Sequence, residues 1–254
     1  MKFSVFSKSV VGYKHEIKNK LSQDYLKFEN INNGIICAIA DGHSGDFFTN
    51  SHKGSKFACE AAIEILKKYE YEDKNKIKYL LESKTLQVEI CNQWRKLVEQ
   101  DMKDSLPMVF KHNYFKYGTT LLMVMIKDDY IICLKLGDGD ILIKQDNNIK
   151  KVLPFYKKDI VDCLAEENAY DKMIWKVIDY EKNISNIIIY SDGFENSFVS
   201  YKSMTEEIDN VLIKYNKNIF SKMKLEKNYD KYLSNLSKNG SLDDISIIFI
   251  NILK

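Results

Sequence analysis

Short apolar runs bordered by aspartate constrain the fold of this chain more than any other feature of its sequence. Three of the runs lead directly into Asp-Gly, and a fourth follows an Asp-Asp pair. The aspartates at these positions are Asp41, Asp138, Asp192 and Asp243. Such runs have the length of buried β-strands, and the neighbouring glycine lets backbone or ligand approach closely. The pattern predicts carboxylates held at strand ends by a rigid sheet.

The order of strand-like and helix-like segments favours an α+β fold. Short strands come first. Two helical patterns follow, one from residue 47 and a second helix over 77–98. The remaining elements are a strand meander over 119–144, strands near 175–178 and 187–190, helices over 204–236, and a last strand at 245–250. Short connections favour antiparallel pairing, because parallel strands need a long crossover. Residues 145–170 are weakly patterned, and we expect a surface excursion there. We expect two stacked antiparallel β-sheets flanked by α-helices, a four-layer α-β-β-α sandwich.

Composition narrows the class of protein. With 254 residues, 45% of them hydrophobic, and no Pro/Gly/Ser-rich linker, the chain is expected to form one domain over 1–254. Its 38 basic and 36 acidic residues show no basic stripe, so no nucleic-acid partner is expected. The apolar runs fall far short of the roughly 20 residues that span a bilayer. The N-terminus lacks a signal-peptide pattern, and the five cysteines form no Cys-x-x-Cys pair, so we expect a cytoplasmic protein without membrane contact.

The aspartates indicate a hard-cation site if the strand ends converge. Mg²⁺ and Mn²⁺ prefer oxygen ligands, and carboxylates at several strand ends would supply them. The segment Asp41-Gly42-His43-Ser44-Gly45 opens a long helix, so a carboxylate, an imidazole and a flexible backbone meet at a helix N-terminus. Asp138-Gly139, taken alone, is equally well read as a hairpin turn.

Six motifs in this order resemble those of the metal-dependent protein phosphatases of type 2C. They are Gln23-Asp24, Ala40-Asp41-Gly42-His43-Ser44-Gly45, Tyr117-Gly118-Thr119-Thr120, Gly137-Asp138-Gly139-Asp140, Ser191-Asp192-Gly193-Phe194 and Ser241-Leu242-Asp243-Asp244-Ile245-Ser246. The resemblance covers nearly the whole chain and is closest to a bacterial branch with a histidine, here His15, and a Gln-Asp pair near the start.

The resemblance implies hydrolysis of phosphoserine and phosphothreonine monoesters by a metal-bound hydroxide that attacks phosphorus. Asp41 would act in catalysis, and His43, with an ordinary pKa near 6.5, would be the general acid. Two Mn²⁺ or Mg²⁺ ions, and a weaker third, are implied as cofactors. Their ligands would be Asp24, Asp41, Gly42, Asp138, Asp192 and Asp243. The implied partners are a phosphoprotein substrate and a cognate serine/threonine kinase, and the chain is expected to be a monomer.

Departures from the family pattern leave alternatives open. The arginine that the family places four residues before its acidic pair is Asn19 here, and Gln23 replaces a glutamate. His15, Lys18 and Lys20 are candidates for the phosphate contact, although a lysine is a point charge and no true substitute for arginine. The missing arginine favours a pseudophosphatase that binds phosphoproteins or a kinase without turnover. A third hypothesis makes Asp138-Gly139-Asp140 an aspartyl nucleophile of the haloacid-dehalogenase kind.

Overall fold

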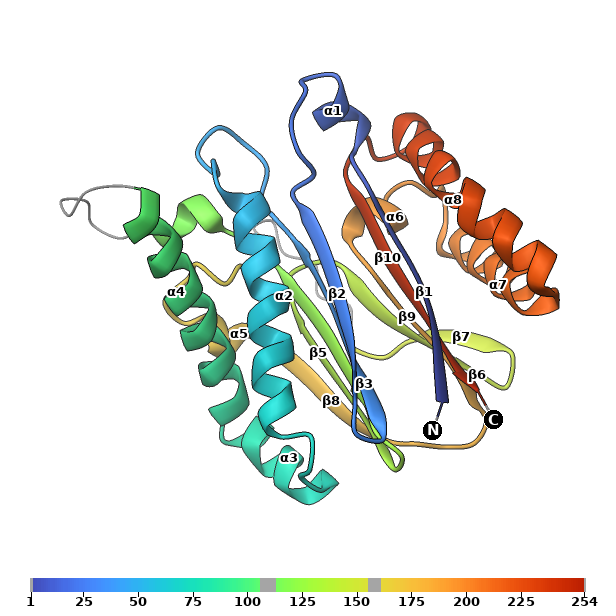
Figure 1. Ribbon diagram of the computed structural model, residues 1–254, viewed down its shortest axis with the longest axis horizontal. Helices are drawn as coiled ribbons and strands as arrows, with labels where there is room; N and C mark the ends of the chain where they lie inside the picture. Colours follow the sequence, from blue (N-terminus) through green and yellow to red (C-terminus); the bar gives the residue numbers. More distant parts are fainter. Residues whose placement is uncertain (1, 106–112, 155–160, 254) are drawn as a thin grey trace.

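Two five-stranded antiparallel sheets stack face to face in the computed structural model, which describes residues 2–105, 113–154 and 161–253 (Figure 1). Sheet A has the strand order β1-β10-β9-β6-β7, and its strands are β1 (Lys2–Val10), β10 (Ile245–Leu253), β9 (Ile184–Tyr190), β6 (Asp140–Gln145) and β7 (Asn148–Lys151). Sheet B has the order β2-β3-β4-β5-β8, and its strands are β2 (Asp24–Ile31), β3 (Gly34–Asp41), β4 (Leu121–Ile126), β5 (Tyr130–Leu136) and β8 (Ile174–Asp179).

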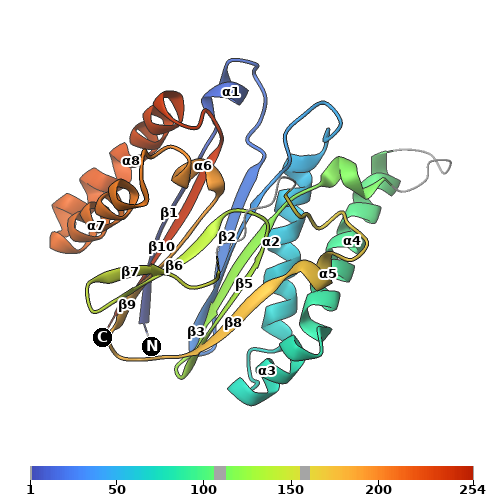
Figure 2. The same cartoon turned by 180° about the vertical axis from the view of Figure 1, so that it is seen from behind.

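Helices cover the outer face of each sheet, as the two opposite views show (Figures 1 and 2). Those on sheet B are α2 (Ser51–Lys68), α3 (Lys74–Glu82) and α4 (Thr85–Ser105), and those on sheet A are α7 (Tyr201–Lys217) and α8 (Ile219–Asn239). Shorter segments are α1 (Tyr13–Glu16), the 3₁₀ turn η1 (Tyr114–Tyr117), α5 (Ala169–Lys172) and α6 (Asp192–Glu195). The expected four-layer α+β sandwich is confirmed. No helix within the described ranges combines the length and apolar character needed to cross a membrane.

Strand β3 shows why its sequence is a continuous apolar run. The side chains of Ile36, Ala38 and Ala40 pack against the helices on sheet B. Those of Ile35, Cys37 and Ile39 point the other way and pack between the two sheets. Successive side chains of a strand point to opposite faces, and both faces of this strand are covered. The same burial continues to the end of the strand, where Asp41 is the first residue able to reach solvent.

Two expectations about the elements need correction. The helical pattern over 77–98 is divided between α3 and α4, because Lys84 adopts a left-handed φ of 60° between them. The expected surface excursion over 145–170 contains strand β7, which pairs with β6 through a turn in which Asp146 and Asn147 have φ of 48° and 66°. Positive φ at both central residues is the geometry of a tight hairpin turn, which Asp and Asn tolerate. Residues 155–160 of that stretch lie outside the described residues.

Candidate metal-binding and catalytic site

Two carboxylates face each other where β2 begins and β3 ends. Asp24 and Asp41 are cross-strand partners in sheet B. Asp24 is buried, and its Oδ2 accepts a hydrogen bond of 2.7 Å from Ser191 Oγ. The Asp41 backbone is held by Thr120, the residue before β4, since the Asp41 N–H donates to Thr120 Oγ1 at 2.9 Å and the Asp41 carbonyl accepts from the Thr120 N–H at 2.8 Å. Like charges directly opposite each other destabilise a sheet, so the pair favours a counter-cation.

Sheet A supplies two more carboxylates from neighbouring strand ends. Asp192 follows β9 and Asp243 precedes β10, and these strands are hydrogen-bonded to each other. A Cβ at Gly193 would lie 2.0 Å from the Asp244 carbonyl oxygen, so only glycine permits this close approach. Ser191 joins the two sheets, because its Oγ donates to Asp24 of sheet B and accepts from the Ser246 N–H at 3.0 Å.

The carboxylates from the two sheets are close enough to perturb one another. Burial, with Asp244 and Asp192 nearby, raises the pKa of Asp24 to about 8. Burial also raises the pKa of Asp41 well above its usual range, and the charges of Asp24, Asp192 and Asp243 add to the effect. The pKa of Asp192 rises to about 6 through burial and through the charges of Asp138 and Asp243, while a hydrogen bond with Asp41 opposes the rise. Without a cation, these carboxyl groups therefore keep protons at pH values at which ordinary aspartates are ionised.

Unpartnered oxygen atoms indicate what the cluster can bind. Asp24 Oδ1 and Asp192 Oδ1 are buried and find no hydrogen-bond donor within the described part of the chain. A buried carboxylate oxygen without a donor is unfavourable unless a proton or a cation satisfies it. An all-oxygen donor set of carboxylates is the set that Mg²⁺ and Mn²⁺ prefer. The residues present therefore fit hard divalent cations.

His43 and Asp138 lie together on one flank of the cluster. The backbone N–H of His43 donates to the Gly118 carbonyl at 2.9 Å. The His43 ring meets the Phe48 ring edge-on at a centroid distance of 5.2 Å. Burial lowers the pKa of His43, whereas the charges of Asp138 and Glu166 act in the opposite direction. Asp138 is exposed in the turn between β5 and β6. The arrangement places an imidazole that can exchange a proton beside the carboxylates.

Asp244 anchors the segments around the site. Its carboxylate accepts the Gly12 N–H at 2.6 Å, the Gln23 N–H at 2.6 Å, and His15 Nδ1 at 3.0 Å to each oxygen. Although His15, Asp243 and Asp244 are spaced closely enough to hold a metal ion, donors already occupy both oxygens of Asp244. We therefore assign Asp244 a positioning role. Asp244 is not among the site residues predicted from the sequence, where its only signal is the doubled acid Asp243-Asp244.

The three candidates for the phosphate contact occupy different environments. His15 is buried against Asp244. Lys18 and Lys20 are exposed in the turn after α1, where Lys20 Nζ lies 3.8 Å from Asp46 Oδ1. Lys14, in contrast, reaches the carboxylate cluster, since its Nζ lies 2.6 Å from Asp243 Oδ2. Nothing in the sequence distinguished Lys14 from its neighbours, because its contact depends on a residue 229 positions away.

Asp140 belongs to a separate buried network. Its Oδ1 lies 3.4 Å from Lys135 Nζ and its Oδ2 lies 2.8 Å from Lys151 Nζ, and the side chain is 1% exposed. Lys151 continues the network to Glu195 of α6 at 2.9 Å. A carboxylate held by two ammonium groups and closed off from solvent is unsuited to act as a nucleophile. The geometry therefore disfavours a catalytic role for Asp140, which the hypothesis of an aspartyl nucleophile in Asp138-Gly139-Asp140 requires.

Comparisons with known proteins identify the family and the fold of this chain. The profile of a family described as Protein phosphatase 2C matches residues 11–229. Among solved structures, the serine/threonine phosphatase Stp1 from Staphylococcus aureus is 14% identical, with a TM-score of 0.67 over 100% of this chain and 96% of that one. The S. agalactiae serine/threonine phosphatase is 17% identical, with a TM-score of 0.66 over 99% and 100%. The catalytic domain of PstP, in complex with two manganese ions, is 14% identical, with a TM-score of 0.59 over 99% of each chain. No curated protein sequence matches the chain.

Proposed function

The chain belongs to the protein phosphatase 2C family, and we propose that it hydrolyses phosphoserine and phosphothreonine in proteins in a metal-dependent reaction. The observation that carries this proposal is the meeting of Asp24 and Asp41 from one sheet with Asp192 and Asp243 from the other. A cluster of bare carboxylates would repel a phosphate dianion, so cations are required before such a substrate can enter.

The proposed ligands come from two strands of sheet B and from segments that border strands of both sheets. They are Asp24, Asp41, Asp138, Asp192 and Asp243 with the Gly42 carbonyl, and we propose that they hold two Mn²⁺ or Mg²⁺ ions and a weaker third. When bound, such ions neutralise the phosphate and lower the pKa of water so that it can attack phosphorus. Asp41 would be kept in place by the pairing of β3 with β2, and Asp192 by its position at the start of α6, directly after the paired strand β9.

His43 is the proposed general acid. The serine or threonine alkoxide that leaves is strongly basic and needs a proton. Because burial lowers the pKa of His43, its protonated form gives up the proton readily, and the charge of Asp138 helps to sustain that form.

His15, Lys18 and Lys20 remain proposed phosphate contacts. Lys18 and Lys20 would attract the anion from the exposed turn, and His15 would act close to Asp244.

A pseudophosphatase is the second candidate function, favoured by the absence of arginine at position 19. It would bind phosphoproteins or a partner kinase without releasing phosphate. The perturbed carboxylates favour the active enzyme, because a binding module has no need to keep four mutually repelling acids together. Either function implies a serine/threonine kinase that acts on the same substrate, and we propose such a kinase as a cytoplasmic partner.

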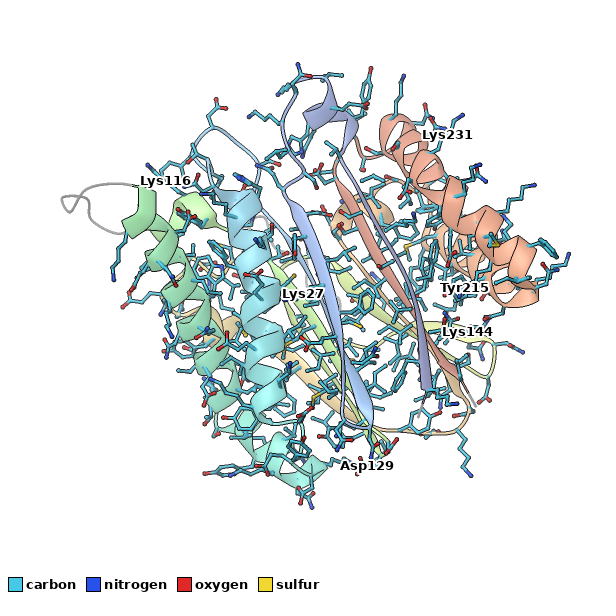
Figure 3. The ribbon with its side chains drawn as sticks, in the orientation of Figure 1. Lys27, Lys116, Asp129, Lys144, Tyr215 and Lys231 are labelled. Atoms are coloured by element: carbon cyan, nitrogen blue, oxygen red, sulfur yellow. The ribbon has the colours of Figure 1, made fainter. Side chains whose placement is uncertain are left out.

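Phosphate release from a phosphothreonine peptide, with and without Mn²⁺, tests the proposal. We expect release only with Mn²⁺, and we expect Asp192→Asn to abolish it. Asp129→Asn is a matched control, since Asp129 is exposed at the opposite end of the molecule from α1 (Figure 3). Mn²⁺ binding in calorimetry without phosphate release from any phosphopeptide would favour the pseudophosphatase. No Mn²⁺ binding would refute the metal-dependent phosphatase.

A further inference from the structure

Lys14 forms an ion pair inside the carboxylate cluster. Its Nζ lies 2.6 Å from Asp243 Oδ2, and the two side chains are 31% and 28% exposed. The other oxygen of Asp243, Oδ1, accepts the Asp244 N–H at 2.9 Å. The ammonium group is also close enough to Asp192 to lower the pKa of that carboxyl. A single lysine therefore supplies positive charge to two of the proposed metal ligands.

The backbone around Lys14 is pinned, so this contact does not depend on a loosely placed surface side chain. The Lys14 N–H donates to the Leu242 carbonyl at 2.9 Å, and the Tyr13 N–H donates to Ser237 Oγ at 3.1 Å. On the other side, the Gly12 N–H donates to Asp244 Oδ1 at 2.6 Å. A Cβ at Gly12 would lie 2.1 Å from the Asp243 backbone carbon, so the two segments are in direct contact.

The ammonium group of Lys14 lies on a carboxylate that is also a proposed ligand of a divalent cation. An ammonium group and a divalent cation on the same carboxylate repel each other, and the repulsion is strong in a partly buried site. Lysine carries its charge on a flexible four-carbon stem with three donors, so the head can move while the backbone stays fixed. A phosphate held beside the ions would offer the displaced ammonium group a new anionic partner.

We propose that Lys14 is a tethered counter-cation of this site: its ammonium group holds Asp243 until a divalent ion displaces it, and then binds the phosphate of the substrate. The inference rests on the proposed function and deepens it. It assigns to Lys14 the contact that the family pattern gives to an arginine and that this chain lacks at position 19. The same side chain would weaken metal binding and strengthen phosphate binding.

Two binding measurements on Lys14→Met test the proposal, because this substitution keeps the apolar stem and removes the charge. With Mn²⁺ alone, calorimetry should give a Kd about tenfold lower than that of the wild type, because a competing cation is gone. With Mn²⁺ saturating, inorganic phosphate should bind about tenfold more weakly, because a donor is gone. Lys14→Arg, which keeps a positive charge, should show neither the tighter metal binding nor the full loss of phosphate affinity.

Lys8→Met is the matched control, since Lys8 forms a lysine–aspartate pair of the same 2.6 Å length with Asp230, away from the cluster. It should leave both constants unchanged. Unchanged or weaker Mn²⁺ binding by a folded Lys14→Met would overturn the proposed competition, and unchanged phosphate affinity would overturn the second role. If the wild type itself binds no Mn²⁺, the failure lies with the proposed function. Circular dichroism of each variant identifies any that does not fold.

Discussion

At the scale of single residues, Asp192 is stabilised by hydrogen bonds and by the charge of Lys14 but destabilised by burial and by neighbouring carboxylates. Asn196 Nδ2 donates to its Oδ2 at 2.9 Å, yet burial and neighbouring charges raise its pKa to about 6. Above that pH, in the metal-free protein, the ionised carboxylate opposes folding. The proposed metal binding requires the same charge. Under the proposed function, Asp192 is a residue kept for metal binding at the expense of stability.

Asp192→Asn is expected to stabilise the metal-free protein while removing metal binding. At pH 8 with a chelator, the free energy of unfolding should rise by about 1 kcal/mol, because a charge with a raised pKa is replaced by a neutral isostere. Mn²⁺ should then add little stability, whereas it should stabilise the wild type. Urea unfolding followed by circular dichroism measures both effects. A metal-free variant that is clearly less stable than the wild type would contradict the electrostatic account.

His43→Asn is expected to affect substrates according to their leaving group. For a phosphothreonine peptide, kcat should fall by about 10²–10³-fold, because the alkoxide no longer receives a proton. For p-nitrophenyl phosphate the fall should be much smaller, since that leaving group is stable as an anion. Steady-state kinetics with the two substrates gives the comparison. Equal losses on both would show that His43 acts through the structure of the site and not as the general acid.

At the scale of elements, the position of α1 is set by a buried carboxylate and not by the helix itself. A helix of four residues has almost no intrinsic stability. Asp244 receives backbone N–H groups from Gly12 before α1 and from Gln23 before β2, and it also holds His15 within α1. The acid therefore ties both ends of the 12–23 segment to the start of β10. Lys14 reaches Asp243 because this segment is fixed.

Asp244→Ala should lower the free energy of unfolding by about 3 kcal/mol, because buried N–H donors lose a charged acceptor. Asp230→Ala serves as the control. It removes a carboxylate whose side chain is 51% exposed in its pair with Lys8, and its effect should stay below about 1 kcal/mol. Denaturant unfolding of the three proteins gives the differences. A similar small effect of both substitutions would show that Asp244 does not anchor the segment.

At the scale of the whole molecule, stacking of the sheets places like charges from opposite layers in one small region. Ser191 links Asp24 of sheet B to strand β10 of sheet A, and the remaining carboxylates lie around this junction. The hydrophobic contact between the sheets holds these charges together, through residues such as Ile39, Leu122 and Ile189. Metal binding should therefore stabilise the sandwich as a whole, because the proposed ligands belong to both sheets.

The stability of the metal-free protein should fall as the pH rises from about 4 to 8. Asp24, with a pKa of about 8, and Asp192, with a pKa of about 6, keep protons in the folded state that the unfolded chain has already released. Each such proton makes stability fall by up to about 1.4 kcal/mol per pH unit between its unfolded and folded pKa values. Saturating Mn²⁺ should reverse the trend, because the metal binds the deprotonated carboxylates. Thermal unfolding between pH 5 and 8, with a chelator or with Mn²⁺, measures this pH dependence of stability. A metal-free protein that becomes more stable as the pH rises would contradict the prediction.

Local sequence patterns predicted much of the fold, and each incorrect prediction of an element has an identifiable cause. The hairpin of β4 and β5 and the final strand were expected near their observed bounds, because long apolar runs separated by polar turns admit few alternatives. The break at Lys84 was missed because a left-handed φ at a lysine has no compositional signal. Strand β7 was missed because its half-exposed residues carry little apolar pattern, although Asp146-Asn147 is a recognisable turn signal.

The sequence by itself determined which aspartates end the strands, that the fold is α+β, and that the motifs belong to one phosphatase family, because these features depend on local spacing and motif order along the chain. Only the tertiary structure decided which charges meet. Asp244 and Lys14 gained their roles through contacts across more than 220 residues, and the raised pKa of Asp24 depends on burial between two sheets. Such effects arise from distances in space and from loss of solvent, neither of which is encoded in the neighbours along the chain.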